Sequence, residues 1–215
     1  MGAIARSIAN NITTSGVFTS SAIANSSVTG ITVLANASDG ITLISSQTAS
    51  NSASISFTSG LTSTYKAYKF VYVNINPASN NTDFQFNMST DSGSNYNVTK
   101  TTTMFRAIHY ESDASTALSY ETGQDLAQST SFQNLIEAIG NEADESASGS
   151  LLLFNPSSTT YVKHFISNSN GYFGTDATFN YYSAGYGNTT SAVNAIQFKM
   201  SSGNFDGTIY LYGIK

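Results

Sequence analysis

The amino-acid sequence predicts an all-β protein: an antiparallel jelly-roll-like β-sandwich with a short N-terminal extended or partly helical arm. The first observation is the presence of 13 Tyr and 13 Phe in 215 residues, since aromatic side chains fit a pleated, half-buried surface. The second is the low share of charged residues, 10%, because Lys, Glu and Arg are the residues that favour exposed helical positions. The third is the supply of 16 glycines, which suit turns between many strands.

Residues 1–40 differ from the rest in composition, and we expect them to form an arm for attachment or oligomerisation. Phe18 is their one aromatic residue. Ile4, Ile8 and Ile12 recur every four residues, which places them on one face of a short helix, and they are the candidate attachment residues. This face can dock on the chain's own domain or on another protein, and the sequence leaves both open. Residues 41–215 are predicted to form the β-sandwich domain.

Alternating apolar and polar residues locate the predicted strands. The strongest case is residues 65–75, where the even-numbered and the odd-numbered positions are both largely apolar. Such a strand is expected at the centre of a sheet and covered on both sides, with Tyr72 and Ile75 on opposite faces. Residues 84–88 predict a half-buried strand. Further strands are predicted at residues 30–34, 40–44, 53–58, 101–110, 151–154, 161–166, 172–182, 193–200 and 208–214.

The middle of the chain carries weaker patterns. Residues 111–131 are polar and give no clear element. Residues 132–139 have apolar side chains at helical spacing, but their neighbours fit a helix or a strand equally well, so both remain open. Residues 142–149 are acidic and predict a solvated loop. Residues 91–95 predict a turn, because they lack the acidic density and the distal Glu of a calcium-binding EF-hand loop.

Charge and composition exclude several classes of function. The net charge of −5 disfavours nucleic acid and anionic membrane surfaces, which both attract basic proteins. The absence of Cys removes disulfides and Cys-ligated metal sites. No apolar run approaches the roughly 18 residues of a membrane-spanning helix, so no membrane insertion is expected. The N-terminus lacks the features of a secretory signal peptide.

Several stretches carry a family resemblance. They are residues 55–61 (ISFTSGL), 65–70 (YKAYKF), 74–78 (NINPA), 90–96 (TDSGSNY), 148–156 (SGSLLLFNP), 161–165 (YVKHF), 205–214 (FDGTIYLYGI) and the opening residues 2–8 (GAIARSI). Together they resemble a group of virion structural proteins from tailed phages, cyanophages and marine phages among them. These motifs form the fold and carry no catalytic signature.

The resemblance implies a β-sandwich displayed on the virion surface as a tail fibre, a tail adaptor or a head decoration. It does not choose among these positions. It also implies synthesis in the host cytoplasm without a signal peptide, self-assembly, with a homotrimer favoured, and contact with other virion proteins. A host surface glycan is a further candidate partner.

Few residues predict chemistry. His109 and His164 are too few for a zinc site without Cys, and a catalytic triad needs a His held by a carboxylate. A glycosidase needs two carboxyl groups across a cleft, for which Glu111 with Asp113, or Glu142 with Asp144 and Glu145, are the candidates. Both acidic groups fit solvated loops better. We therefore expect no catalytic residue, no metal and no cofactor.

Aromatic residues give the candidate binding site. Tyr172, Phe173, Tyr181, Tyr182 and Tyr186 lie in a region rich in Gly and Asn. Tyr offers rigid contact area and a hydroxyl for hydrogen bonding, which suits a saccharide or a protein partner. The alternative is that these residues form ordinary core and surface. In functional terms, the alternative to a virion protein is a free-standing, lectin-like carbohydrate-binding module.

Overall fold

The computed structural model describes residues 40–215. The arm predicted at residues 1–40, with Ile4, Ile8 and Ile12, and the strand predicted at residues 30–34 lie outside the described residues, apart from Gly40. The described part is all-β, as predicted, and contains no helix that could span a membrane. Its strands are β1 (Ile41–Ser52), β2 (Ile55–Phe57), β3 (Ala67–Pro77), β4 (Thr82–Ser89), β5 (Lys100–Tyr110), β6 (Thr116–Tyr120), β7 (Gln133–Ile139), β8 (Ala147–Phe154), β9 (Lys163–Phe173), β10 (Ala177–Gly187), β11 (Ala195–Met200) and β12 (Phe205–Ile214).

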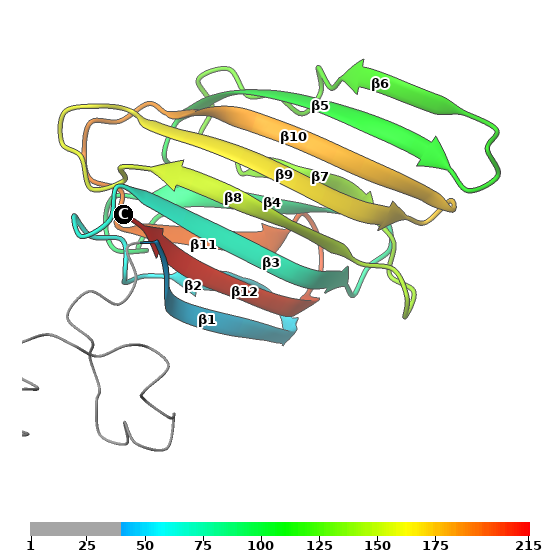
Figure 1. Ribbon diagram of the computed structural model, residues 1–215, viewed down its shortest axis with the longest axis horizontal. Helices are drawn as coiled ribbons and strands as arrows, with labels where there is room; N and C mark the ends of the chain where they lie inside the picture. The colour runs from blue at the N-terminus through cyan, green and yellow to red at the C-terminus, as the bar shows by residue number, and fades with distance from the viewer. Residues whose placement is uncertain (1–39) are drawn as a thin grey trace, which may run out of the picture. The chain divides into compact units, whose positions relative to one another are not determined.

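All strand pairs are antiparallel, and the twelve strands form one sheet that folds over itself (Figure 1). The front layer has the order β1-β12-β3-β8-β9-β10-β5-β6, and the back layer has the order β2-β11-β4-β7. The layers join at one side through the pair of Ile139 in β7 and Phe173 in β9. At the other side, β1 and β2 follow each other directly in the chain. The sheet is therefore nearly closed into a barrel.

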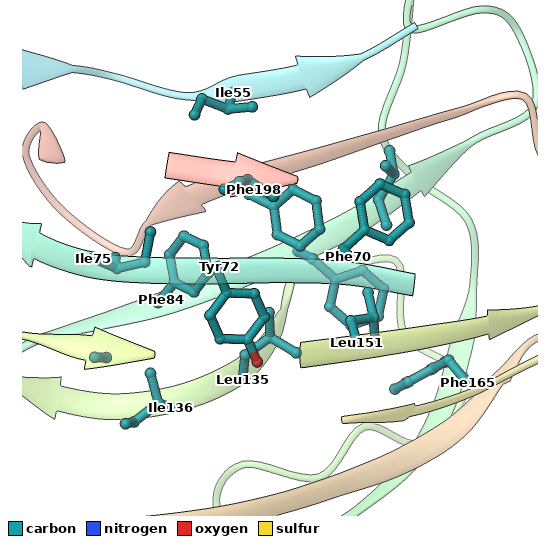
Figure 2. Packing of buried hydrophobic residues seen from close by; sticks show 14 of the residues in the cluster. Ile55, Phe70, Tyr72, Ile75, Phe84, Leu135, Ile136, Leu151, Phe165 and Phe198 are labelled. Carbon is teal, nitrogen blue, oxygen red and sulfur yellow. The ribbon is translucent and has the colours of Figure 1, made fainter. Parts of the chain in front are cut away.

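The hydrophobic core lies between the two layers and is built around Phe198 of β11 (Figure 2). Its ring contacts those of Phe57, Phe70, Phe84 and Phe86, with centroids 5.3 to 6.4 Å apart. Phe198 is fully buried, as are Phe70, Phe84 and Phe86. Burying one such side chain contributes about 2–3 kcal/mol to the free energy of unfolding. Both layers supply these rings, so the cluster holds the layers together.

Strand β3 lies inside the front layer, between β12 and β8, but it is covered on one side only. Tyr72 is fully buried, whereas Val71 is half-buried and Val73 is 37% exposed on the outward side. The prediction of cover on both sides is wrong, because an antiparallel sheet can face water with one surface. The prediction that Ile75 opposes Tyr72 is also wrong. The register shifts at Asn74, which has a left-handed φ of 52°, and this shift returns Ile75 to the core.

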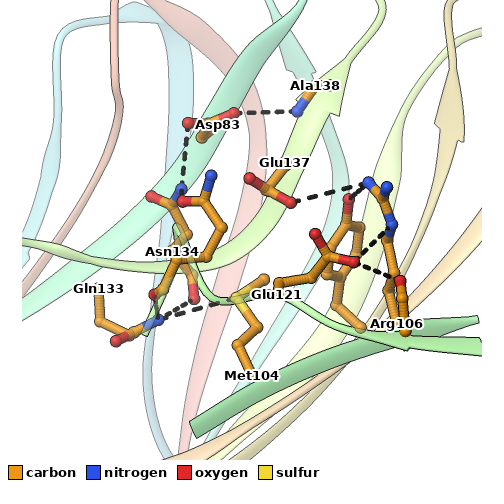
Figure 3. A network of polar contacts seen from close by, with 11 residues as sticks. Asp83, Met104, Arg106, Glu121, Gln133, Asn134, Glu137 and Ala138 are labelled. Atoms are coloured by element: carbon orange, nitrogen blue, oxygen red, sulfur yellow. Dashed lines mark hydrogen bonds and ion pairs between the residues drawn. The ribbon is translucent and has the colours of Figure 1, made fainter. Parts of the chain in front are cut away.

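Residues 133–139 form strand β7, which settles the open choice between helix and strand. The pairing with β4 contains register shifts. Leu135 and Ile136, adjacent in the sequence, are both buried. Ala138 has a φ of 52° and donates its N–H to Asp83 Oδ1 at 3.0 Å (Figure 3). An irregular strand thus gives apolar residues the spacing of a helix. Strand β6 was not indicated by the sequence, because its residues are mostly exposed.

Two lysines, Lys100 and Lys163, point into the protein at the ends of β5 and β9 and are fully buried. The Lys100 Nζ donates to Asn87 Oδ1 at 2.5 Å and to the Val98 carbonyl oxygen at 2.9 Å. Both partners are neutral, so burial opposes the charged form. Burial lowers the pKa of Lys100 from 10.5 to about 7, and it also lowers the pKa of Lys163.

We expect Lys100 to make the stability of the protein depend on pH. Between pH 7 and 10.5 the unfolded chain holds a proton on this lysine that the folded protein has lost, so the free energy of unfolding rises with pH in this range. In the variant Lys100→Met, residue 100 cannot titrate. The difference in the free energy of unfolding between the wild type and this variant should therefore change by roughly 4 kcal/mol between pH 7 and 10.5. Urea unfolding at several pH values measures this difference.

The matched control for this prediction is Lys69→Met, because Lys69 lies on the outward side of β3 and is only partly buried. With rising pH, the free energy of unfolding relative to the wild type should change more for Lys100→Met than for Lys69→Met, which removes the same charge from the surface. An equal change in the two variants would show that Lys100 keeps an ordinary pKa.

Candidate functional site

The outward surface of β8, β9, β10, β5 and β6, termed the outer face, carries the candidate site. Alternate residues of these strands point away from the core. The register places Phe105 of β5 beside Tyr182 of β10, and their rings stack with centroids 5.0 Å apart. Both side chains are 41% exposed. The outer face therefore presents aromatic surface to solvent in the middle of a sheet.

The predicted aromatic cluster divides between the outer face and the core. Tyr172, Tyr182 and Tyr186 lie on the outer face, along β9 and β10. Tyr181 is fully buried. Phe173 is half-buried and stacks on the buried Phe179, with ring centroids 4.5 Å apart. The structure thus leaves three of the predicted residues on the outer face, spread along two strands. Period-two alternation along β10 would have separated Tyr181 from Tyr182.

A cleft of about 680 Å³ opens at one end of the outer face, and we call it the acidic cleft. Its walls come from the end of β5, the loops at residues 111–113 and 144–146, and the neighbouring parts of β9 and β10. Its lining residues are His109, Tyr110, Glu111, Asp113, Asp144, Ser146, Asn170, Gly171, Tyr172 and Thr178. The fold brings together one predicted aromatic residue and members of both acidic groups singled out in the sequence.

Hydrogen bonds fix the side chains in the acidic cleft. The Tyr172 hydroxyl donates to Asp176 Oδ1 at 2.9 Å, and this bond is the largest cause that raises the pKa of Tyr172 to about 12. The negative charges of Asp176, Glu111 and Asp144 act in the same direction. His109 Nε2 lies 3.1 Å from Asp113 Oδ1. The cleft therefore has a negative potential and holds a neutral, oriented phenol.

The acidic loop at residues 142–149 is only partly solvated. Glu142 and Asp144 are exposed, but Glu145 is buried, and its Oε2 accepts the Glu142 N–H at 2.8 Å. The prediction of a solvated loop is therefore wrong for Glu145, which instead holds the turn together. A Cβ at Gly140 would meet the Glu145 carboxylate, so a larger residue there would displace this side chain from its position in the turn. The residues from Ala147 onward belong to β8.

A second hollow of about 510 Å³, the apolar groove, lies at the other end of the outer face. Phe154, His164, Ile166, Ala184 and Tyr186 contribute to its lining. The rings of His164 and Tyr186 meet edge to face, with centroids 6.1 Å apart. His164 thus lies far along the strands from His109, and the two histidines do not form one site.

Carboxylates that the sequence did not single out surround Arg106 (Figure 3). Arg106 Nε lies 2.9 Å from Glu121 Oε1, and its Nη1 lies 3.9 Å from Glu137 Oε2. The same Nη1 donates to the Tyr181 hydroxyl at 3.3 Å. Burial raises the pKa of Glu137. These groups link β5 and β10 of the front layer to β7 of the back layer, which gives them a structural role.

The turn at residues 91–95 uses its carboxylate within the chain. Asp91 Oδ1 accepts the Ser89 hydroxyl at 2.6 Å and the Asn95 N–H at 2.9 Å, and Oδ2 accepts Asn95 Nδ2 at 2.7 Å. These bonds lower the pKa of Asp91 to about 2. Among residues 40–215, no group of three or more His, Asp or Glu side chains is placed to hold a metal ion.

Comparison with known proteins adds no relative to these observations. No protein-family model matches the chain, and neither the curated proteins nor the solved structures contain a significant match. The class of protein is therefore defined by the fold and the outer face alone: an all-β protein with an acidic cleft and an apolar groove on one surface.

We expect Asp176→Asn to lower the pKa of Tyr172 towards its ordinary value of 10, because the hydrogen bond to the Asp176 carboxylate is the largest cause of the rise. Nuclear magnetic resonance of tyrosine labelled at Cζ resolves the titration of a single ring. Asp206→Asn is the control, because Asp206 bonds to the Asn51 N–H and does not line the cleft. An unchanged titration of Tyr172 in Asp176→Asn would rule out this hydrogen bond.

Proposed function

We propose that this chain is a non-enzymatic binding and structural protein on the surface of a tailed-phage particle. In this proposal, residues 1–40 attach the protein to the particle or join protomers, with a homotrimer favoured. The β domain then presents its outer face to a partner, as part of a tail fibre, a tail adaptor or a head decoration. The finer fold in this proposal is a jelly-roll-like sandwich, supported by the separation of the strands into a front and a back layer.

The observation that carries the proposal is the apolar surface exposed on the outer face. Phe105 and Tyr182 are 41% exposed, Ile166 is 53% exposed and Leu118 is 76% exposed. Large exposed apolar patches on soluble proteins mark interaction surfaces. No charged side chain separates the stacked Phe105 and Tyr182 rings, and such depletion of charge is typical of the centre of an interface.

The resemblance to virion proteins supports the choice of particle. Three of the resembling stretches form neighbouring strands of the front layer, because residues 65–70 enter β3, residues 148–156 cover β8 and residues 205–214 form β12. The motifs are therefore parts of one continuous surface in the fold. They support a shared architecture and do not identify a shared ligand.

The proposal predicts that the protein is a component of intact particles of the phage that encodes it. An antiserum against the full chain should label these particles after gradient purification, and peptides of the chain should appear in their mass spectra. Free recombinant protein should compete away the label, which controls for its specificity. Purified infectious particles that lack the protein would refute the proposal.

A second candidate function, saccharide binding, is favoured by the acidic cleft. Carboxylates and the Asn170 amide are suitable partners for sugar hydroxyls, and the oriented Tyr172 ring offers a flat surface for a sugar face. Sites of this kind combine a few polar groups with aromatic contact area. In this reading the chain is a lectin-like module, either on a particle or free-standing.

We expect Tyr172→Ala to weaken binding of the best ligand on a glycan array by at least about tenfold, because it removes the flat surface of the cleft. Tyr161→Ala is the matched control, since Tyr161 is 69% exposed and does not line the cleft. Titration calorimetry of wild type and variants gives the affinities. An array without ligands, or equal losses in both variants, would remove saccharide binding and leave the virion proposal intact.

A further inference from the structure

Strand β6 forms a free edge of the front layer. Within residues 40–215 it pairs with β5 alone, and Figure 1 shows no strand beyond it. A free edge presents unpaired backbone N–H and C=O groups, which form a template for another strand. Proteins protect such edges with charged residues, prolines or bulges. The five residues of β6, TALSY, contain no charge and no proline, and their pairing with β5 is regular.

The hydrogen-bond pattern shows which residues face the free edge. Glu121 donates its N–H to the Met104 carbonyl oxygen at 2.9 Å, and this bond sets the phase of the ladder. Bonded and non-bonded pairs alternate in an antiparallel ladder. Ala117 and Ser119 therefore direct their backbone groups towards β5. Leu118, between them, directs its N–H and C=O away from β5.

The side chains along this edge are apolar. Leu118 is 76% exposed and Tyr120 is 50% exposed. The register places Tyr120 beside Phe105, whose ring stacks on Tyr182. The free edge therefore continues directly into the exposed aromatic surface of the outer face. A strand added to β6 would extend the sheet and cover part of this surface.

The charges around β6 do not select a charged partner. Three nearby carboxylates already have partners: Asp113 pairs with His109, Glu121 pairs with Arg106, and Asp125 accepts the Tyr120 hydroxyl at 2.8 Å. The edge therefore presents a neutral strand with an apolar centre. The best complement of such a strand is another neutral strand with an apolar centre, and β6 itself meets this description.

The other edges of the sheet are less suited to pairing. Strand β1 bonds to β12 with two register shifts, between Leu43 and Ser45 and between Ala49 and Ser52, and bulges of this kind disrupt edge pairing. Strand β2 has only three residues. Strand β6 is therefore the edge that the fold leaves open for a partner.

We propose that β6 is a self-association site, at which two copies of the chain pair their β6 strands antiparallel about a two-fold axis at Leu118. In this arrangement Leu118 lies opposite the partner's Leu118. Thr116 of each copy lies opposite Tyr120 of the other copy. Such an isologous contact closes after two copies. Since the strand is short, the contact is weak for two free molecules and gains strength where many copies are held together, as on a particle.

The test is sedimentation velocity of the full-length wild type and two variants at concentrations up to about 0.5 mM. Leu118→Pro removes an N–H that has no partner within the monomer, and proline is tolerated at such edge positions. Leu118→Lys places a charge on the axis and covers the case in which the proline variant fails to fold. We expect the mass of the sedimenting wild-type species to double as the concentration rises. In both variants we expect association to be at least about tenfold weaker.

Val73→Lys is the matched control, because it adds the same charge to an exposed apolar position in β3, away from the edge and outside the outer face. It should associate like the wild type. A trimer that assembles through residues 1–40 is compatible with the proposal only if a hexamer forms and Leu118→Lys returns it to a trimer. A wild type that stays monomeric, or any assembly that neither Leu118 variant changes, overturns the proposal.

Discussion

The packing of Phe198 against rings from both layers is the interaction on which the rest of the structure depends. It joins a back layer of four strands to a front layer of eight strands. The narrower layer cannot cover the whole inner surface of the wider one. On the inner side of β5, Arg106 pairs with Glu121, and the chain between β6 and β7 bonds to β5 through the carbonyl oxygens of Leu126 and Ser129. The same mismatch leaves β6 at the rim of the front layer.

The low charge of the sequence is distributed unevenly by the fold. Lys100 and Lys163 are buried in the interior, where their Nζ atoms donate hydrogen bonds to neutral amide and carbonyl oxygens. Several carboxylates instead gather at one end of the outer face. The outcome is a surface with local negative potential at the acidic cleft and almost no charge across its aromatic centre. One face thus offers two chemically different areas for binding.

Sequence patterns predicted the all-β class and most strands, since regular alternation survives wherever pairing is regular, as in β5. The single strand predicted at residues 172–182 is wrong, because a turn at residues 174–176 divides this stretch between β9 and β10. Sequence patterns also failed where the register shifts. In β7, two adjacent buried residues produced a helical spacing, and in β3 the shift at Asn74 moved Ile75 to the other face.

The acidic cleft could not be predicted for a different reason. Asp144 and Tyr172 were each singled out, but their proximity follows from pairing of distant strands. The exposure of Leu118 depends on strand order, which no local pattern contains.

The position of β12 has a consequence for how the chain folds. It lies between β1 and β3, and it brings Thr48 within hydrogen-bonding distance of Thr208, 160 residues away in the sequence. Pairs so distant form slowly, because a large loop must close before the contact forms. During synthesis, β1 has no sheet to join until β12 has left the ribosome. Strand β1 therefore stays without its partner until the last strand of the domain has been made, so the folding of the domain ends with the pairing of its first and last strands.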